Sequence, residues 1–89
     1  LGTAIMKYFV YLIISKYKQK CFSYVGYTNN LKKRLNKHNT SRGAKFTRGR
    51  KWILVYSAGY NSKSKAMSEE YKLKKNFKLR NKIKSNFYK

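Results

Sequence analysis

"SYVGYTNNLKKRLNKHN", residues 23–39, is the stretch that decides the fold class. It opens as a strand-like run that ends at Gly26, passes through a polar turn, and then takes a helical pattern. Asn29 or Asn30 can cap a helix that begins near Leu31, because an asparagine side chain satisfies the free backbone N–H groups there. A strand, a short turn and a helix in this order indicate a chain that mixes both kinds of element.

Inside the predicted helix, two rows of side chains run in parallel. Leu31 and Leu35 are four residues apart and are expected to pack inward. Arg34 and His38 have the same spacing and lie along an adjoining face. The helix therefore presents an arginine and the only histidine of the chain side by side.

The sequence on either side supplies further strands and helices. Residues 7–14 and 21–26 are rich in β-branched and aromatic residues, and the polar residues 15–20 connect them, which predicts a hairpin. The prediction for the whole chain is an α+β fold, a small three-stranded antiparallel sheet with helices packed on it, in the order β-β-α-β-α-α. The other predicted elements are an exposed basic loop over 39–51, a strand over 52–60, a helix over 61–77 with Ala66, Glu70, Leu73 and Phe77 along one side, and a short basic helix over 78–89.

The length of 89 residues allows one compact domain. We expect this domain to cover residues 6–89, with residues 1–5 as a leader or a cloning remnant ahead of Met6. Residues 1–5 lack the basic start and the cleavage site of a secretory signal, and the apolar run 8–14 is too short to span a bilayer. These features predict an intracellular, cytoplasmic protein without a membrane segment.

The charge of the chain points to its partner. Lys and Arg total 23 against two acidic residues, which gives a formal net charge of +21. Such a charge opposes the compact state by self-repulsion and requires an anionic partner, either nucleic acid or a membrane surface. The membrane reading fails because the helices are too short and too embedded among strands. Since 42% of the residues are apolar and 17% aromatic, the chain is not a disordered basic tail.

The two carboxylates, Glu69 and Glu70, limit the chemistry that the chain can perform. Neighbouring helical positions point about 100° apart, so only one of the pair faces a given site. Glu70 lies in the row of Ala66 and Leu73, and Glu69 falls on the lysine-rich flank. A two-metal nuclease gathers several carboxylates around two ions about 3.5–4 Å apart, and this chain cannot build that site. Any phosphodiester cleavage must use one metal ion at most. Taken alone, Glu70 is equally a solvated or lysine-paired glutamate.

Four further side chains carry candidate chemistry, and each also has a structural explanation. Tyr11 and Tyr24 lie on the two hairpin strands, and a tyrosine acts as a base only if its pKa, about 10 when unperturbed, is lowered. Arg34 can hold a phosphate bidentately or be a solvated helix residue. His38 has the only side chain with an unperturbed pKa near neutrality, or is a cation that offsets the dipole at the C-terminal end of a helix. None of these residues indicates catalysis by itself, so the argument for an active site depends on all of them occurring together.

As an ordered set, these residues resemble the GIY-YIG endonuclease signature. "FVY" (9–11) and "YVG" (24–26) stand for the two triplets, followed by Arg34, His38 and the helical Glu70. The first triplet departs from the signature, with phenylalanine and valine in place of glycine and isoleucine, and its tyrosine is kept. The likeness covers residues 7–77 and is greatest to the small branch with stand-alone bacterial proteins. The same core forms the catalytic domain of structure-specific branched-DNA nucleases.

The resemblance implies a role for each residue of the set. Tyr11 would act as the general base, or activate the water that attacks the phosphorus, and Tyr24 would orient that water or the scissile phosphate. Gly26 would let the backbone turn closely beneath the site. Arg34 would stabilise the charge that develops on the phosphate.

Two residues complete the implied site. His38 would hydrogen-bond within it and tune the tyrosine. Glu70 would be the sole protein ligand of one Mg²⁺ or Mn²⁺ ion, in agreement with the carboxylate count. Asn76 and Asn81 are available in the later helices, and no motif fixes a role for either.

The implied function is a metal-dependent DNA endonuclease that hydrolyses phosphodiesters, selective for branched, flapped or nicked DNA in repair or recombination. The alternative is a non-catalytic basic nucleic-acid-binding domain, which explains the charge and gives no reason for the ordered set. Backbone contacts with little base specificity are expected, which leaves room for a protein partner that supplies specificity. The residues expected to contact DNA are Lys32, Lys33, Arg42, Lys45, Arg48, Arg50 and Lys51.

Overall fold

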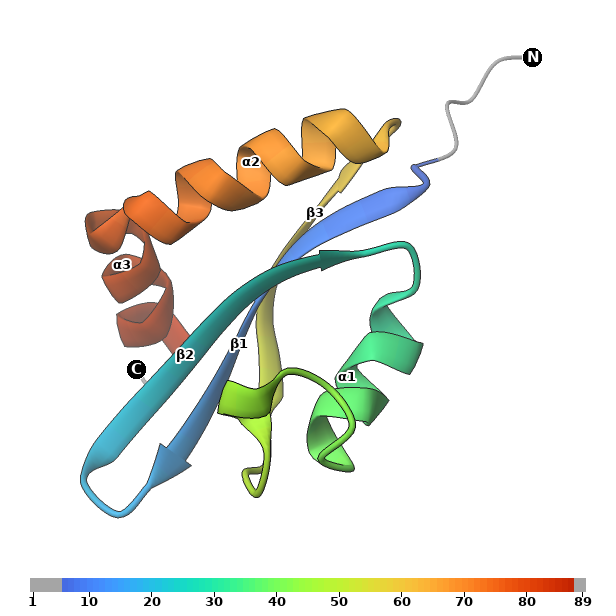
Figure 1. Cartoon of the computed structure of the whole chain (residues 1–89). Helices are drawn as coiled ribbons and strands as arrows, with labels where there is room; N and C mark the ends of the chain where they lie inside the picture. The colour runs from blue at the N-terminus through green and yellow to red at the C-terminus, as the bar shows by residue number, and fades with distance from the viewer. Residues whose placement is uncertain (1–5, 88–89) are drawn as a thin grey trace.

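The computed structural model describes residues 6–87. The prediction that residues 1–5 are a leader lies outside the described residues. The predicted α+β fold and its order of strands and helices are confirmed (Figure 1). In order the elements are β1 (Tyr8–Tyr17), β2 (Lys20–Thr28), α1 (Leu31–Asn39), the short 3-10 helix η1 (Lys45–Thr47), β3 (Ile53–Tyr60), α2 (Lys63–Lys75) and α3 (Phe77–Phe87).

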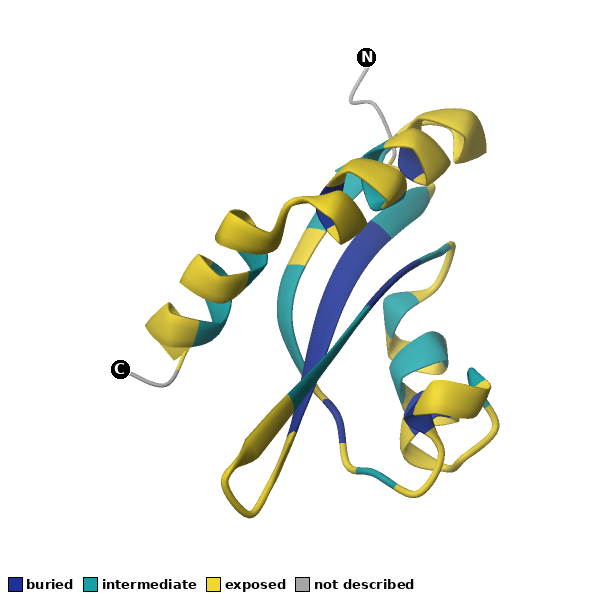
Figure 2. Ribbon diagram, turned by 60° about the vertical axis from the view of Figure 1, so that its left-hand side comes forward, coloured by how far each residue is buried: buried dark blue, intermediate teal, exposed yellow. Residues whose placement is uncertain are grey.

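The three strands form an antiparallel sheet in the order β2-β1-β3. β1 is the central strand, and its side chains from Val10 to Ile14 are buried on both faces of the sheet (Figure 2). This burial explains the continuous apolar run of β1, because a strand covered on both sides has no solvent face for polar residues.

Alternate residues of β1 point into two separate cores. Val10 and Leu12 pack with Ala66 and Leu73 of α2 on one face of the sheet. Tyr11 and Ile13 pack with Trp52 on the other face, where Leu31 and Leu35 of α1 close the core as predicted. Figure 1 shows α2 and α3 gathered on one side of the sheet, with α1 and η1 on the other. The side-chain period of two along a strand therefore turns Tyr11 toward α1.

The hairpin is longer than the sequence predicted. Residues 15–20, expected to be a polar connection, continue the ladder through the pairs Ser15 with Phe22 and Tyr17 with Lys20. Lys18, with a φ of 56°, makes the turn instead. β2 also continues to Thr28, so the predicted position of a turn directly after Gly26 is wrong. The reason is that β1 offers backbone partners along its whole length, which polar strand ends accept as readily as apolar ones.

The helix predicted over 61–77 is wrong at its end. α2 stops at Lys75, and Asn76 leaves the helical conformation with φ −93° and ψ 77°. The Asn76 side chain then accepts a 3.0 Å hydrogen bond from the backbone N–H of Leu79, which caps α3. Ala66 and Leu73 are buried as expected, whereas Phe77 starts the new helix and is 63% exposed.

The loop predicted over 39–51 is exposed only in part. Thr47, at the end of η1, is fully buried, and Trp52 directly after the loop is buried beside it. Between residues 6 and 87 no helix combines the length and the apolar character needed to cross a membrane.

Candidate active site

The hydroxyl of Tyr11 is the centre of a buried hydrogen-bond network. Arg34 donates from Nε to this oxygen at 3.2 Å, and His38 Nε2 lies 2.8 Å from it. Tyr11 is 2% exposed and His38 is 0% exposed. Arg34 and His38 are four residues apart on α1, so their side chains reach the same oxygen from one helix. Arg34 and His38, which the sequence predicted to lie in one row on the helix, thus both contact the hydroxyl oxygen of Tyr11 on the central strand.

Gly26 makes room for the Tyr11 ring. The two residues face each other across the β1–β2 ladder. A Cβ atom on Gly26 would lie 2.6 Å from Tyr11 Cζ and closer still to the hydroxyl oxygen, which no pair of real atoms tolerates. The glycine is therefore needed at the site for the space it leaves inside a continuous strand.

The hydrogen bonds around His38 have only one consistent direction. The Thr47 hydroxyl donates to the carbonyl of Ala44 at 2.8 Å, so its oxygen is left to accept from His38 Nδ1, also at 2.8 Å. His38 then carries its proton on Nδ1, and Nε2 accepts from the Tyr11 hydroxyl. The chain of donors runs from Arg34 to Tyr11, and from Tyr11 to His38.

Local contacts hold the two ends of this network. The Asn30 side chain caps α1 by accepting from the backbone N–H of Lys33 at 3.0 Å, as one of the two predicted caps. At the other end of α1, the Asn39 side chain accepts from the Trp52 backbone N–H at 2.6 Å and donates to the Trp52 carbonyl at 3.1 Å. The Trp52 indole donates to the Thr47 carbonyl at 2.9 Å. Helix α1, η1 and the start of β3 are thereby fixed around His38.

Burial sets the protonation states of this network. Desolvation, helped by the nearby positive charge of Arg34, lowers the pKa of His38 from 6.5 to about 4. His38 is therefore neutral at physiological pH, which removes the alternative in which it is a cation at the end of α1. Burial raises the pKa of Tyr11, and the hydrogen bond from Arg34 opposes that rise. The proton of the Tyr11–His38 pair thus rests on the tyrosine.

The lowered pKa of His38 predicts how stability depends on pH. The unfolded chain binds a proton at His38 below about pH 6.5, whereas the folded chain resists binding it down to about pH 4. The unfolded state then holds more protons in this window, so the free energy of unfolding falls as the pH falls from 6.5 toward 4. Urea unfolding at about pH 7 and pH 5 measures the change. A His38→Gln variant, with no group to titrate, should lose this part of the pH dependence, and an equal dependence in both proteins would contradict the assignment.

Tyr24 lies on the neighbouring strand with its ring against the network. Its ring centre is 5.1 Å from that of His38, with the planes tilted by 60°. The pKa of Arg34 is raised, first by its hydrogen bond to Tyr11 and in smaller part by Tyr24. The structure thus brings together four of the five predicted catalytic residues, Tyr11, Tyr24, Arg34 and His38.

Glu70 lies on α2, which packs on the other side of the sheet from α1 (Figure 1). Its carboxylate pairs with Lys74 at a long 3.8 Å, whereas Glu69 is bound by both Lys65 and Lys72 at 3.3 and 3.1 Å. The negative charge of Glu70 has the smallest of the effects on the pKa of Tyr11, and raises it. It makes no hydrogen bond to the other four among the described contacts.

The donor chemistry around Glu70 fits a single, mostly hydrated divalent ion. Over residues 6–87, no group of three or more His, Cys, Asp or Glu side chains could enclose a metal ion. Mg²⁺ is commonly held by one or two carboxylates together with water and substrate phosphate oxygens, which is the arrangement that one loosely paired glutamate can provide. Glu69, held by two lysines, is the less available of the two carboxylates.

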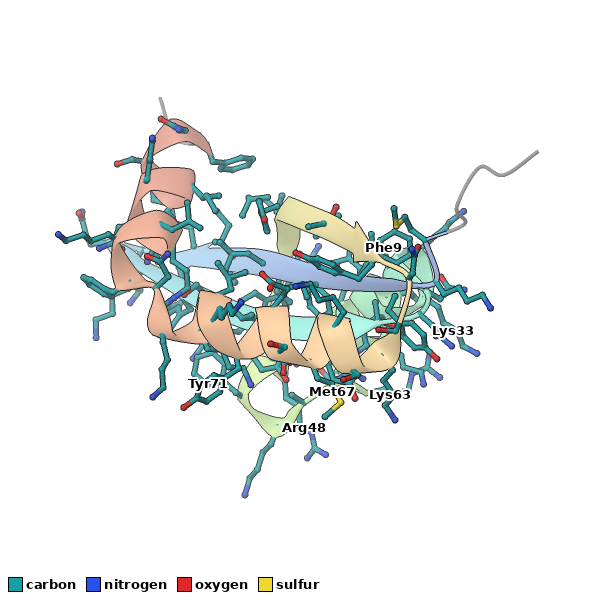
Figure 3. The ribbon with its side chains drawn as sticks, turned by 90° about the horizontal axis from the view of Figure 1, so that it is seen from above. Phe9, Lys33, Arg48, Lys63, Met67 and Tyr71 are labelled. Carbon is teal, nitrogen blue, oxygen red and sulfur yellow. The ribbon has the colours of Figure 1, made fainter. Side chains whose placement is uncertain are left out.

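A basic hollow of about 450 Å³ opens beside the network, at the end of the sheet where β2 leads into α1. Four cationic side chains line it, and Figure 3 shows two of them, Lys33 of α1 and Lys63 of α2, projecting at the same end of the molecule. Arg34 belongs both to this lining and to the Tyr11 network, so its guanidinium connects the hollow to the buried Tyr11 hydroxyl. The cationic lining residues are Lys33, Arg34, Lys37 and Lys63.

Five of the seven residues predicted to contact DNA lie at two hollows, and Arg42 and Lys45 line neither of them. Lys33 lines the hollow just described, with Lys32 exposed beside it on α1. Arg48, Arg50 and Lys51 line a second hollow of about 650 Å³ at the far end of the hairpin. Arg42 donates to the Thr40 hydroxyl at 3.2 Å, and Lys45 is exposed at the start of η1.

The comparison with protein families decides the assignment. The family model described as "GIY-YIG catalytic domain" matches residues 7–84. The chain belongs to the GIY-YIG family. The resemblance seen in the motifs is confirmed, and membership implies a nuclease, of a family that generally uses a divalent metal ion.

The relatives of this GIY-YIG protein carry the name UPF0213. One from Oceanobacillus iheyensis is 52% identical over 52 residues, which are 57% of this chain and 60% of the relative. One from Streptococcus agalactiae is 54% identical over 48 residues, 53% of this chain and 54% of the relative. One from Clostridium perfringens is 47% identical over 66 residues, 73% and 70% of the two chains. The matched segment spans less than two thirds of the length of the first two relatives. No solved structure gives a significant match.

Sequence reasoning missed several residues that the structure places at the site. Thr47 and Gly43 lie against His38, and a Cβ on Gly43 would come within 3.0 Å of His38 Cε1. Both belong to the stretch read as an exposed loop, and their contacts cross from loop to helix, where no local pattern reveals them. Lys37 could have been found from the sequence, because it follows Lys33 by four residues on α1. Lys63 had no such signal.

Proposed function

We propose that the protein is a metal-dependent DNA endonuclease that hydrolyses phosphodiester bonds with the help of Tyr11. The observation that carries this proposal is the position of the Tyr11 hydroxyl, held between a guanidinium and the unprotonated nitrogen of a neutral histidine. The same bonds also hold α1 against the sheet, but a domain that only neutralises phosphates would not require a hydroxyl held in this way. The network supplies what hydrolysis needs, a proton acceptor and a fixed positive charge beside a basic hollow.

The Tyr11–His38 pair can take a proton from the attacking water without first forming a tyrosinate. As the Tyr11 oxygen accepts the water proton, its own proton passes to His38 Nε2, 2.8 Å away. Tyr11 ends neutral, His38 ends as an imidazolium, and the hydroxide forms its bond to phosphorus as the bond to the leaving oxygen breaks. The leaving oxygen keeps the electron pair of that bond and takes up a proton from solvent. Because His38 is unprotonated from about pH 4 upward, its Nε2 is free to receive this proton at neutral pH, and the burial that lowers its pKa also makes it a weak acceptor.

Charge stabilisation would come from both sides of the phosphate. Arg34 lines the hollow and keeps its positive charge at all working pH values, so it can offset the charge that develops on the phosphate oxygens. Glu70 would hold one Mg²⁺ or Mn²⁺ ion, which neutralises phosphate charge and lowers the pKa of bound water. Tyr24, whose ring packs against His38, would orient the water or the phosphate with its hydroxyl.

We propose branched, flapped or nicked DNA as the substrate class, in repair or recombination. The support is the charge of the surface, because the hollow and the exposed lysines of α1 offer positive charge to a phosphate backbone whatever its base sequence. A protein partner that supplies specificity would fit the same arrangement.

Nicking of supercoiled plasmid in the presence and absence of Mg²⁺ tests the proposal. We expect metal-dependent conversion to the open circle, suppressed by EDTA. Flapped and nicked oligonucleotide duplexes should be cut faster than the intact duplex. Tight DNA binding without cleavage under any metal condition would overturn the proposal in favour of a non-catalytic nucleic-acid-binding domain.

Thr47 offers a test of the proton route, because it acts on the reaction only through His38. Thr47→Val keeps the shape and leaves His38 Nδ1–H without an acceptor, whereas Thr47→Ser keeps the hydroxyl. The bond from Nδ1–H to Thr47 strengthens as His38 takes up the proton, because a bond from a charged donor is about twice as strong as a neutral one, so the valine variant should lose about 5- to 100-fold in kcat, with the serine variant near the parent. NMR of the imidazole nitrogens should show a single Nδ1–H tautomer in the parent and the serine variant. Equal kcat in all three proteins would contradict the route.

A further inference from the structure

Phe46 stands out among the exposed residues near the network. Its ring lies in a stacked arrangement with Tyr24, with ring centres 6.3 Å apart and planes at 20°, and Trp52 packs at its edge at 6.2 Å. Even so, Phe46 is 51% exposed, in a chain whose surface is otherwise rich in lysine and arginine. About half of this large aromatic ring is therefore open to solvent beside Tyr24.

Arg50 extends this aromatic surface. Its guanidinium lies 3.7 Å from the ring centre of Phe22 and 5.9 Å from that of Phe46. Stacking on two rings keeps the planar cation in place, which a freely moving surface arginine lacks. We call the group of Phe22, Tyr24, Phe46 and Arg50 the Phe46 platform.

The platform is held by rigid neighbours. Successive residues of a 3-10 helix point about 120° apart, so the burial of Thr47 turns Phe46 outward. Thr47 is fixed in turn by its bonds to His38 and Ala44, and its carbonyl receives the Trp52 indole. The ring of Phe46 is thus offered to a ligand without the loss of freedom that a mobile side chain would suffer on binding.

We infer that the Phe46 platform stacks an unpaired base of the substrate, next to the phosphate that enters the Tyr11 network. The chemistry fits a nucleobase because an aromatic face and a guanidinium are the two surfaces on which bases stack. The bases of a duplex are already covered by their neighbours, so only a single-stranded segment can use the platform. Stacking is blind to base identity, and no sequence preference is expected from it. This inference rests on the proposed function to the extent that the partner is DNA.

An apolar segment of a partner protein is the competing occupant of such a ring. The surroundings favour the nucleotide, because Lys45, Arg48 and Arg50 flank Phe46 with positive charge suited to a phosphate backbone. If a partner protein were the occupant, the ring would make no difference to the binding of single-stranded DNA.

Equilibrium binding in EDTA tests the inference without any need for cleavage. Fluorescence anisotropy would compare a single-stranded oligonucleotide of about 12 nucleotides with a duplex of the same length, since single-strand sites commonly span about 4–16 nucleotides. The variants are Phe46→Ala, Phe46→Tyr and, as the matched control, Phe77→Ala. Phe77 is equally an exposed phenylalanine beside an arginine, Arg80, on α3.

The expected result is a selective loss. Phe46→Ala should weaken single-strand binding by about 5- to 100-fold, the range that one base–aromatic stack contributes, and leave duplex binding unchanged. Phe46→Tyr should bind like the parent, as should Phe77→Ala. Because no charge is removed, the slope of log affinity against log salt should be the same in parent and variant. A 2-aminopurine placed in the strand should be quenched by the parent and not by Phe46→Ala.

Two outcomes would overturn the platform. In the first, Phe46→Ala binds single-stranded DNA as tightly as the parent does. In the second, Phe46→Ala loses the same affinity for single-stranded and for duplex DNA. The result is separable from the proposed function. A parent that cuts nothing, yet loses single-strand affinity on Phe46→Ala, keeps the platform and excludes the nuclease. A parent that cuts DNA with no such loss keeps the nuclease and excludes the platform.

Discussion

Tyr11→Phe is expected to abolish DNA cleavage and to leave DNA binding intact. The hydroxyl is the only atom that touches both Arg34 and His38 in the network, so its removal disconnects the water from the proton acceptor. Loss of a general acid–base group typically lowers kcat by about 10²- to 10⁴-fold. Plasmid nicking with Mg²⁺ measures the rate, and anisotropy with a labelled flap in EDTA measures the binding.

The same substitution also leaves His38 Nε2 buried without its donor, which costs about 1–3 kcal/mol of stability. Urea unfolding must therefore show that the variant is folded under the assay conditions. Tyr56→Phe is the matched control, because Tyr56 is a partly buried tyrosine that packs against the opposite core of the sheet. Cleavage by Tyr11→Phe at the parental rate would remove Tyr11 from the mechanism.

Glu70→Gln should have an effect of similar size through the metal ion. Replacing the carboxylate with an amide of the same shape removes the charged ligand, and we expect a loss of at least about 10²-fold in cleavage at low Mg²⁺. A titration with Mg²⁺ should show half-maximal activity moved to a higher concentration. Binding of DNA in EDTA should not weaken, since a negative charge is removed from a basic protein.

Glu69→Gln is a close control for this experiment. The two residues are neighbours on α2, yet Glu69 is paired with Lys65 and Lys72 on the surface. Its replacement should leave the Mg²⁺ dependence unchanged and cost little stability, because exposed ion pairs contribute about 0–1 kcal/mol. If Glu69→Gln loses activity and Glu70→Gln does not, the metal ligand is Glu69 and our assignment to Glu70 is wrong.

The parts of this protein that the sequence predicted are those encoded over short distances. The order of strands and helices, the cap at Asn30 and the Leu31–Leu35 row follow from spacing within one element. The same spacing placed Arg34 and His38 on one side of α1, where the structure shows both bound to Tyr11.

What the sequence could not predict depends on contacts between elements. The strand pairs beyond Ile14 form because a partner strand is present, although the side chains there are polar. Gly26 looked like a turn residue and proves to be the space for a ring on the neighbouring strand. No sequence pattern pointed to Thr47, because its role depends on its hydrogen bond to Nδ1 of His38, nine positions earlier on α1.

The distances along the chain between the network residues have a consequence for newly made protein. Tyr11 is 27 positions from His38 and 23 from Arg34, so their contacts exist only after α1 has docked on the finished sheet. The positive charge, by contrast, is present in every conformation of the polypeptide. Under the proposed function, a nascent or partly unfolded chain would already bind nucleic acid, whereas any reaction at Tyr11 would begin only once the tertiary structure has assembled. Affinity would follow from the composition, and cutting from the folded state alone.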